Sequence, residues 1–199
     1  DGFNGERWQS DLSIYNPATQ PATYSLAFVS GSGWEGATNA VWSTLEVGSG
    51  QMRTFPNILA STFGLAEGAW GVVLVRGDSV PASPVLVSRT YNAADAEVKG
   101  TFGLSVPATW VGAGLGSHSN GAASLLADLR HDASYRTNLT VANLGEETAE
   151  VEVLFRDENG TVLGSPAKVT VEARGVKQLN AALSAAVATG GNPIGGAGY

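Results

Sequence analysis

The chain has 199 residues, of which 43% are hydrophobic and 15% are charged, and its formal net charge is −7. Its eleven Lys and Arg residues are scattered, which argues against nucleic acid as a partner because phosphate binding needs clustered positive charge. No run approaches the roughly 18 apolar residues of a membrane span, and there are no cysteines, so we expect no membrane insertion, no disulfide and no thiolate-bound metal.

The first half of the chain predicts short strands separated by turns. In chain order, the expected strands are the alternating run Trp8–Ile14, the run through Tyr24, Leu26 and Phe28, then Val41–Val47, Met52–Phe55, Trp70–Gly77 and Ser83–Asn92. Trp70–Gly77 is almost continuously apolar and is expected to be a buried central strand. Between these strands, Pro56-Asn57 predicts the start of one helical turn that ends at Gly64, because proline favours the first turn and glycine the end.

The second half of the chain repeats this order. RWQSDLSIYNP at residues 7–17 reappears as YRTNLTVANLG at residues 135–145, and from Trp8 and Tyr135 the two segments align without a gap at an offset of 127. The run Ala149–Phe155 keeps that offset. Asn159-Gly160 then predicts a tight hairpin, since both residues tolerate positive φ, and beyond this shorter turn the offset is 124. A period of this length is that of a whole folded unit.

We therefore expect an all-β protein of two tandem antiparallel immunoglobulin-like β-sandwich units, each with one short helical turn. The first unit spans residues 1–107 and the second spans residues 108–199. The second unit lacks counterparts of residues 70–75 and 84–92, which would leave its sheet edges unpaired. Either the parent chain continues, or a neighbouring copy completes the unit by strand exchange, for which the candidate interface residues are Gly196, Ala197, Gly198 and Tyr199.

No residue pattern indicates a catalytic mechanism, and we expect neither an enzyme nor a bound cofactor or metal. His131 lies near Asp128 and Asp132, but there is no G-x-S-x-G turn to present a serine, and His118 lies in a Gly/Ser-rich segment. GAGLGS at residues 112–117 lacks the strand–turn–helix context of a dinucleotide site. DENG at residues 157–160 lacks the later acidic residue of an EF-hand loop. A pair of carboxylates that meet in space for glycoside hydrolysis stays open as an alternative.

The five tryptophans raise the alternative of a sugar-binding surface. Trp34 and Trp110 lie in Gly-rich loops and are the candidate ligand contacts, because indole rings combine a flat apolar face with a polar edge. The other three lie in predicted strands and are expected in the core: Trp8, Trp42 and Trp70.

Asp11 and Asn138 occupy the same position of the repeat. This Asx position predicts a local hydrogen bond near the start of a strand. Asn138-Leu139-Thr140 also satisfies the N-glycosylation pattern.

Four stretches resemble the tandem repeats of large secreted bacterial proteins, whose first strand has the form FRTNLGLVNPG: YRTNLTVANLG, AEVEVLFRDENGTVLG, VEARGVKQLNAAL and, in the first unit, PVLVSRTYN. The first unit departs from the pattern in its long loop SGSGWEGATN at residues 30–39. The resemblance implies an extracellular or cell-surface β-sandwich module. We expect a structural or adhesive protein, a repeat of a stalk or filament that self-associates through an open sheet edge. The alternative is a carbohydrate-binding accessory module of a secreted hydrolase, with polysaccharide as its partner.

Overall fold

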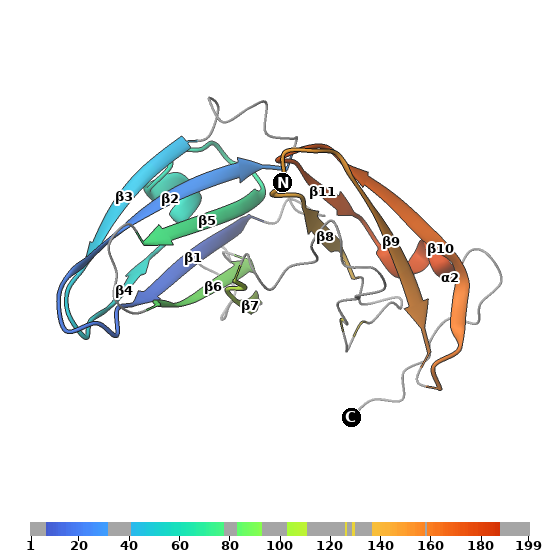
Figure 1. Ribbon diagram of the computed structural model, residues 1–199, viewed down its shortest axis with the longest axis horizontal. Coiled ribbons are helices and arrows are strands. Elements are labelled where there is room, and N and C mark those ends of the chain that lie inside the picture. The colour runs from blue at the N-terminus through green and yellow to red at the C-terminus, as the bar shows by residue number, and fades with distance from the viewer. Residues whose placement is uncertain are drawn as a thin grey trace. The chain divides into compact units, whose positions relative to one another are not determined.

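The computed structural model describes residues 7–31, 41–77, 83–92, 103–110, 126, 129, 137–157 and 159–187. The chain divides into two compact units, Asp1–Ser30 with Ala37–Gly114 and Gly31–Gly36 with Leu115–Tyr199. Where it is described, the chain is built mainly of antiparallel strands, which confirms the predicted all-β class (Figure 1).

Two antiparallel sheets enclose the core of the first unit (Figure 1). One sheet has the order β4-β1-β6-β7, with β1 (Trp8–Tyr15), β4 (Met52–Phe55), β6 (Val85–Asn92) and β7 (Gly103–Pro107). The other has the order β3-β2-β5, with β2 (Ala22–Ser30), β3 (Val41–Val47) and β5 (Gly71–Gly77). Their facing side chains join α1 (Ile58–Ser61) in one buried apolar cluster: Leu12, Ile14, Ala22, Tyr24, Leu26, Phe28, Val47, Ile58 and Phe63. The first unit is therefore sandwich-like, with alternate residues of each sheet packed inward.

The central strand of the three-stranded sheet is β2, which is more buried than β3 or β5. Tyr24 and Leu26 are completely buried, which confirms the predicted inward face of this strand. The expectation that Trp70–Gly77 would be the central strand is wrong, because β5 lies at the edge of the described sheet and its residues are half-buried or exposed. An apolar run indicates which side chains can be buried on the two faces of a strand. It does not indicate whether the strand has a hydrogen-bonded neighbour on each side.

The sequence pattern did not predict β7, which pairs antiparallel with β6 from Tyr91–Gly103 to Val87–Pro107. All five residues of β7 are exposed, so the segment has no buried alternation by which it could be recognised. Its proline lies on a strand at the edge of the described sheet, where a missing N–H is tolerated.

The helical turn α1 follows Pro56-Asn57, as predicted. Asn57, just before α1, has a φ of 44°, and Gly64, three residues after its last residue, has a φ of 65°. Glycine adopts this conformation without the steric penalty that other residues meet, and the N–H groups of Gly64 and Leu65 donate to the carbonyl oxygens of Ala60 and Leu59.

The second unit pairs β8 (Leu139–Ala142) with β11 (Val176–Leu179) and β9 (Ala149–Arg156) with β10 (Val162–Val171), and its last described element is α2 (Ala182–Val187). Among its described residues, one buried cluster consists of Phe155, Ala182 and Leu183.

The strand register of the second unit matches that of the first at the predicted offsets. The corresponding partners are Leu12–Phe55 and Leu139–Leu179 for the first strand pair, and Ala22–Val47 and Ala149–Val171 for the second. In both cases the first residue is displaced by 127 positions and the second by 124. The pairing keeps these offsets from Ala149–Val171 to Val153–Ala167, and nearer the shorter turn a bulge between Leu163 and Ala167 shifts it, so that Phe155 pairs with Leu163.

That turn differs in detail from the predicted hairpin. Of its two central residues, Gly160 has a positive φ of 83° while Asn159 does not. The Asp157 carboxylate instead accepts hydrogen bonds from the backbone N–H groups of Asn159 and Thr161, at 2.9 and 2.8 Å. The predicted hairpin between β9 and β10 is confirmed, and its Asx turn followed by glycine uses one left-handed residue.

Candidate functional site

Asn16 is a buried polar residue whose side chain joins three segments of the first unit. Its Nδ2 donates to the carbonyl oxygens of Gln20, Val47 and Gly48 at 2.9, 3.1 and 3.2 Å. Its Oδ1 accepts the Ala18 N–H at 3.0 Å, and its own N–H donates to the carbonyl oxygen of Gln51. A buried amide is stable only when such bonds satisfy it, so Asn16 fixes the corner where β1 ends and β3 turns into β4.

Asn143 makes the same bonds in the second unit. Its Nδ2 donates to carbonyl oxygens at 2.7, 3.1 and 3.0 Å, and its Oδ1 accepts an N–H at 3.0 Å; the partners are Glu147, Val171, Glu172 and Gly145. Its N–H donates to the carbonyl oxygen of Gly175. Every partner stands 127 or 124 residues after its counterpart at Asn16. The alignment of Asn16 with Asn143 was visible in the sequence, but their reach across the fold was not.

Asp11 and Asn138 also have equivalent roles. Oδ1 of Asp11 accepts the backbone N–H of Asn57 at 2.9 Å, and Oδ1 of Asn138 accepts that of Ala181 at 3.0 Å. The predicted hydrogen-bonding role is present, but it is not local, since the partners lie 46 and 43 residues away. The side chain anchors the helical turn to the sheet because the first N–H groups of a helix have no partner within it.

Tyr91 adds a second partner to Asp11 in the first unit. Its hydroxyl donates to Asp11 Oδ1 at 3.2 Å, and the Arg89 guanidinium lies 4.8 Å from the centre of its ring. Burial, together with the charge of Asp11 and this hydrogen bond, raises the pKa of Tyr91 above its usual value of 10.0. The group is a neutral donor at physiological pH and shows no feature of a catalytic base.

The four described tryptophans are all exposed. Trp110, a candidate ligand contact, is 63% exposed just after β7. The expectation that the other three lie in the core is wrong, because they are 52%, 57% and 42% exposed: Trp8, Trp42 and Trp70. On β3, Trp42 lies on the face opposite to that of the buried Val47. Trp8 is the first residue of β1, and Trp70 lies just before β5. Trp34 lies outside the described residues.

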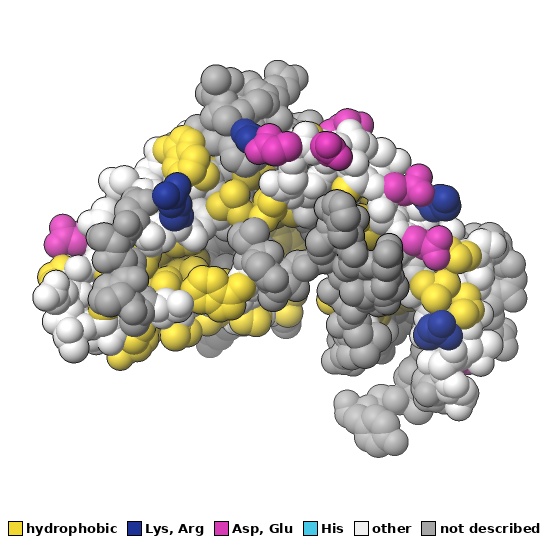
Figure 2. Space-filling view, viewed as in Figure 1, with side chains coloured by type: hydrophobic (Ala, Val, Ile, Leu, Met, Phe, Trp, Pro, Cys, Tyr) yellow, Lys and Arg dark blue, Asp and Glu magenta, His cyan; other side chains and the backbone are white. Residues whose placement is uncertain are grey.

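Hydrophobic side chains also reach the surface of the first unit (Figure 2). On the outer face of the β4-β1-β6-β7 sheet, Tyr15 lies directly between Met52 and Val85, and these side chains are 39%, 67% and 57% exposed. Val87 continues this row at 39% exposure. The row is apolar apart from the hydroxyl group of Tyr15.

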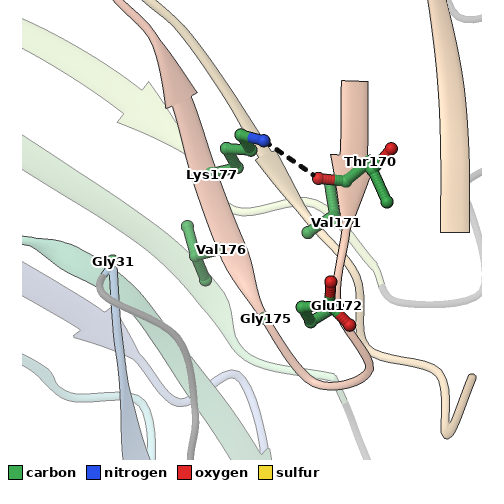
Figure 3. A pocket seen from close by; sticks show the side chains of 7 residues that line it. All are labelled: Gly31, Thr170, Val171, Glu172, Gly175, Val176 and Lys177. Carbon is green, nitrogen blue, oxygen red and sulfur yellow. Dashed lines mark hydrogen bonds between the residues drawn. The ribbon is translucent and has the colours of Figure 1, made fainter. Parts of the chain in front are cut away.

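A recess of about 240 Å³ lies in the second unit at the turn between β10 and β11 (Figure 3). Its lining consists of Gly31, Thr170, Val171, Glu172, Gly175, Val176 and Lys177. The Lys177 ammonium donates to the carbonyl oxygen of Thr170 at 3.3 Å, so this cation is engaged by the backbone. The recess offers one carboxylate and one engaged ammonium, which is too little to assign a reaction.

The other residues singled out in the sequence lie outside the described part of the chain: His118, His131, Asp128, Asp132 and the segment 196–199. Within that part, no group of three or more His, Cys, Asp or Glu side chains is placed to hold a metal ion. The Asp157 carboxylate of the DENG segment is bonded to its own turn. Of the helices that the structure describes, none has the length and apolar character to cross a bilayer.

Comparison with known proteins gives no relative: no protein family, no curated protein and no solved structure matches this chain.

Proposed function

We propose that this chain is an extracellular structural or adhesive protein, a repeat module of a surface stalk or filament made of two immunoglobulin-like β-sandwich units. The observation that carries the proposal is the repeated asparagine corner. Asn16 and Asn143 each use their amide for four hydrogen bonds to backbone groups at matching offsets. A polar residue repeated for this purpose serves the fold, because its amide N–H groups are all directed at the backbone.

The surface chemistry supports the same role. Two of the ion pairs among described residues join exposed side chains, Lys168 with Glu150 and Arg7 with Glu67, and a third joins the half-buried Arg174 to the exposed Glu146. Exposed pairs of this kind contribute little to stability and do not form a charged site. The resemblance to repeats of secreted bacterial proteins supports the proposed location outside the cell.

Surface location is tested on intact cells of the organism that produces the chain. Antibodies against the chain are expected to label unbroken cells, and protease treatment of those cells is expected to release its peptides. Detection only after lysis, with a cytosolic marker protein as the reference, would contradict the proposal.

The second candidate is a carbohydrate-binding accessory module, and the exposure of Trp110 favours it. An exposed indole can stack on a sugar ring. Pull-down with insoluble cellulose, chitin and xylan separates the two candidates. A carbohydrate module binds one of them and loses that binding in Trp110→Ala, whereas Trp42→Ala, equally exposed but on β3, serves as the matched control. The structural proposal predicts no retention of the wild-type chain.

A further inference from the structure

We propose that the outer edge of β9 accepts an antiparallel strand of the β5 type from another molecule, with apolar residues facing the core and an arginine opposite Glu152. The inference rests on the proposed structural role. It specifies the kind of strand that would pair with the edge of β9.

The two units differ at this edge. In the first unit β2 pairs with β3 on one side and with β5 on the other. In the second unit β9 pairs with β10 in the same register from Ala149 to Val153, with a bulge in β10 beyond, and no other described strand lies beside it. The edge that β5 covers in the first unit is thus unpaired within the described ranges of the second, and an unpaired strand edge is a template for another strand.

Side-chain burial points to the same edge. Tyr24 and Leu26 are completely buried in β2, whereas Val151 and Val153, their counterparts in β9, are only half-buried. Leu154 is 39% exposed where Ala27 is completely buried. Val151 and Val153 lie on the inward face of β9 and Leu154 on the opposite face, so both faces are less covered than those of β2.

The first unit supplies the register for the incoming strand. There, β2 and β5 pair through Ser25–Arg76, Leu26–Val75 and Ala27–Leu74. Shifted by 127 residues, these pairs become Glu152 opposite arginine, Val153 opposite valine and Leu154 opposite leucine. The exposed Leu154 gains an apolar neighbour, and Glu152 gains a cation.

Glu152 is suited to that cation. Lys168 lies opposite Glu152 in the β9–β10 pair but donates its hydrogen bond to Glu150, at 3.1 Å. Among the described residues no hydrogen bond or close ion pair of Glu152 is formed, and its charge adds only the smallest contribution to the raised pKa of Lys168, behind Glu150. Opposite charges facing each other across strands stabilise a pair and like charges destabilise it, so this edge selects a strand with arginine at that position.

The first experiment tests the register by disulfide trapping, since the chain has no cysteine of its own. The probe is a synthetic peptide with the sequence of residues 70–77, extended by two lysines for solubility and carrying cysteine in place of its leucine. Added to full-length Leu154→Cys, it is expected to form a mixed disulfide, because paired Cβ atoms lie within bonding range. The matched control is Ala27→Cys, whose edge is already occupied by β5 and which is expected to give no product.

Three results would overturn the inference. The first is an equal yield from a peptide with its cysteine moved by two residues, which would mean that no register is selected. The second is an equal yield from Ala27→Cys. The third is a disulfide-linked dimer of Leu154→Cys without peptide, which would mean that a second copy of β9 occupies the edge.

The second experiment tests charge selection with a labelled peptide and fluorescence anisotropy. Glu152→Arg is expected to weaken binding by about three- to tenfold, and the peptide in which arginine is replaced by glutamate is expected to recover it. Equal affinity in all four combinations would contradict the assignment of Glu152. These peptide measurements do not depend on where the chain resides, so their failure is distinguishable from a failure of the cell-surface test.

Discussion

Asn16 and Asn143 show how one side chain can replace a stretch of backbone pairing. Each amide satisfies carbonyl oxygens at the end of a strand, where the ladder stops and those groups have no strand partner. Removing the amide leaves the carbonyls unbonded, and this cost exceeds the modest net value of the bonds themselves.

Asn16→Ala is therefore expected to destabilise the first unit by about 2–4 kcal/mol, and Asn143→Ala to destabilise the second by about 1–2 kcal/mol, because Asn143 is less buried. Urea denaturation of each variant measures the change. Asn16→Asp is the sharper control, since it keeps Oδ1 and replaces the donor by an acceptor facing carbonyl oxygens. If Asn16→Asp were as stable as the wild type, the corner would not depend on donation.

Tyr24 and Tyr91 form a contrasting pair of phenols. The Tyr24 hydroxyl is buried without a hydrogen-bond partner among the described residues, while that of Tyr91 donates to Asp11. Tyr24→Phe is expected to leave stability unchanged or to raise it by about 1 kcal/mol, because it removes an unsatisfied polar group. Tyr91→Phe is expected to lower it by about 1 kcal/mol. Thermal denaturation of the two variants gives the comparison, and a loss in Tyr24→Phe larger than that in Tyr91→Phe would contradict it.

The same tyrosines predict a loss of stability at alkaline pH. Burial raises the pKa of Tyr24, and burial with the nearby Asp11 raises that of Tyr91, both from a usual 10.0. Above pH 10 the unfolded chain releases these protons while the folded chain still holds them. The stabilisation is complete below that pH and is lost as pH rises toward the folded pKa. Urea midpoints measured from about pH 9 to pH 11 should fall less steeply in the double variant Tyr24→Phe, Tyr91→Phe than in the wild type.

At the scale of elements, the residue that precedes each of the two helices has the same left-handed backbone conformation. Asn57 and Ala181 have φ values of 44° and 47°, and the N–H of each donates to the Asx side chain of the first strand. Asparagine tolerates this conformation better than alanine does. The anchoring bond holds Ala181 in place despite its Cβ.

Ala181→Gly is expected to stabilise the second unit by about 0.5–1 kcal/mol, since glycine adopts positive φ without that penalty. Asn57→Ala is expected to destabilise the first unit by a similar amount. Chemical denaturation of both variants tests the pair. A loss of stability in Ala181→Gly would mean that the entropy of the unfolded chain outweighs the relief of strain.

The elements that the sequence predicted well are those with alternating burial. Leu12 and Ile14 on β1, and Tyr24, Leu26 and Phe28 on β2, gave both the strands and the offset that the register confirms. β7 was missed because all of it is exposed, and the tryptophans were misplaced because a bulky apolar residue can stand at a strand end or on an outer face. The partners of Asn16 and Asp11 lie across the fold, where spacing along the chain carries no signal.

At the scale of the molecule, the described residues of the two units differ in their buried apolar clusters. That of the first unit has nine members and that of the second has three, apart from the buried Val169, Val171 and Val176. Because hydrophobic burial is the dominant stabilising term of a domain, we expect the described core of the second unit to be the less stable one. The two halves of one repeated plan are thus expected to differ in stability.

We therefore expect the second unit to unfold first and on its own. In hydrogen exchange followed by mass spectrometry, peptides from β9 and β10 should exchange before those from β2, because local opening follows local stability. Leu26→Ala should lower the stability of the first unit by about 2–5 kcal/mol, while Val153→Ala, at the equivalent but half-buried position of β9, should cost the second about 1 kcal/mol. Leu26→Ala should leave exchange in β9 unchanged. A common exchange rate for β2 and β9 would mean that the two units share one cooperative core. If the β5 peptide did not slow exchange in β9, the β9 edge would need no partner.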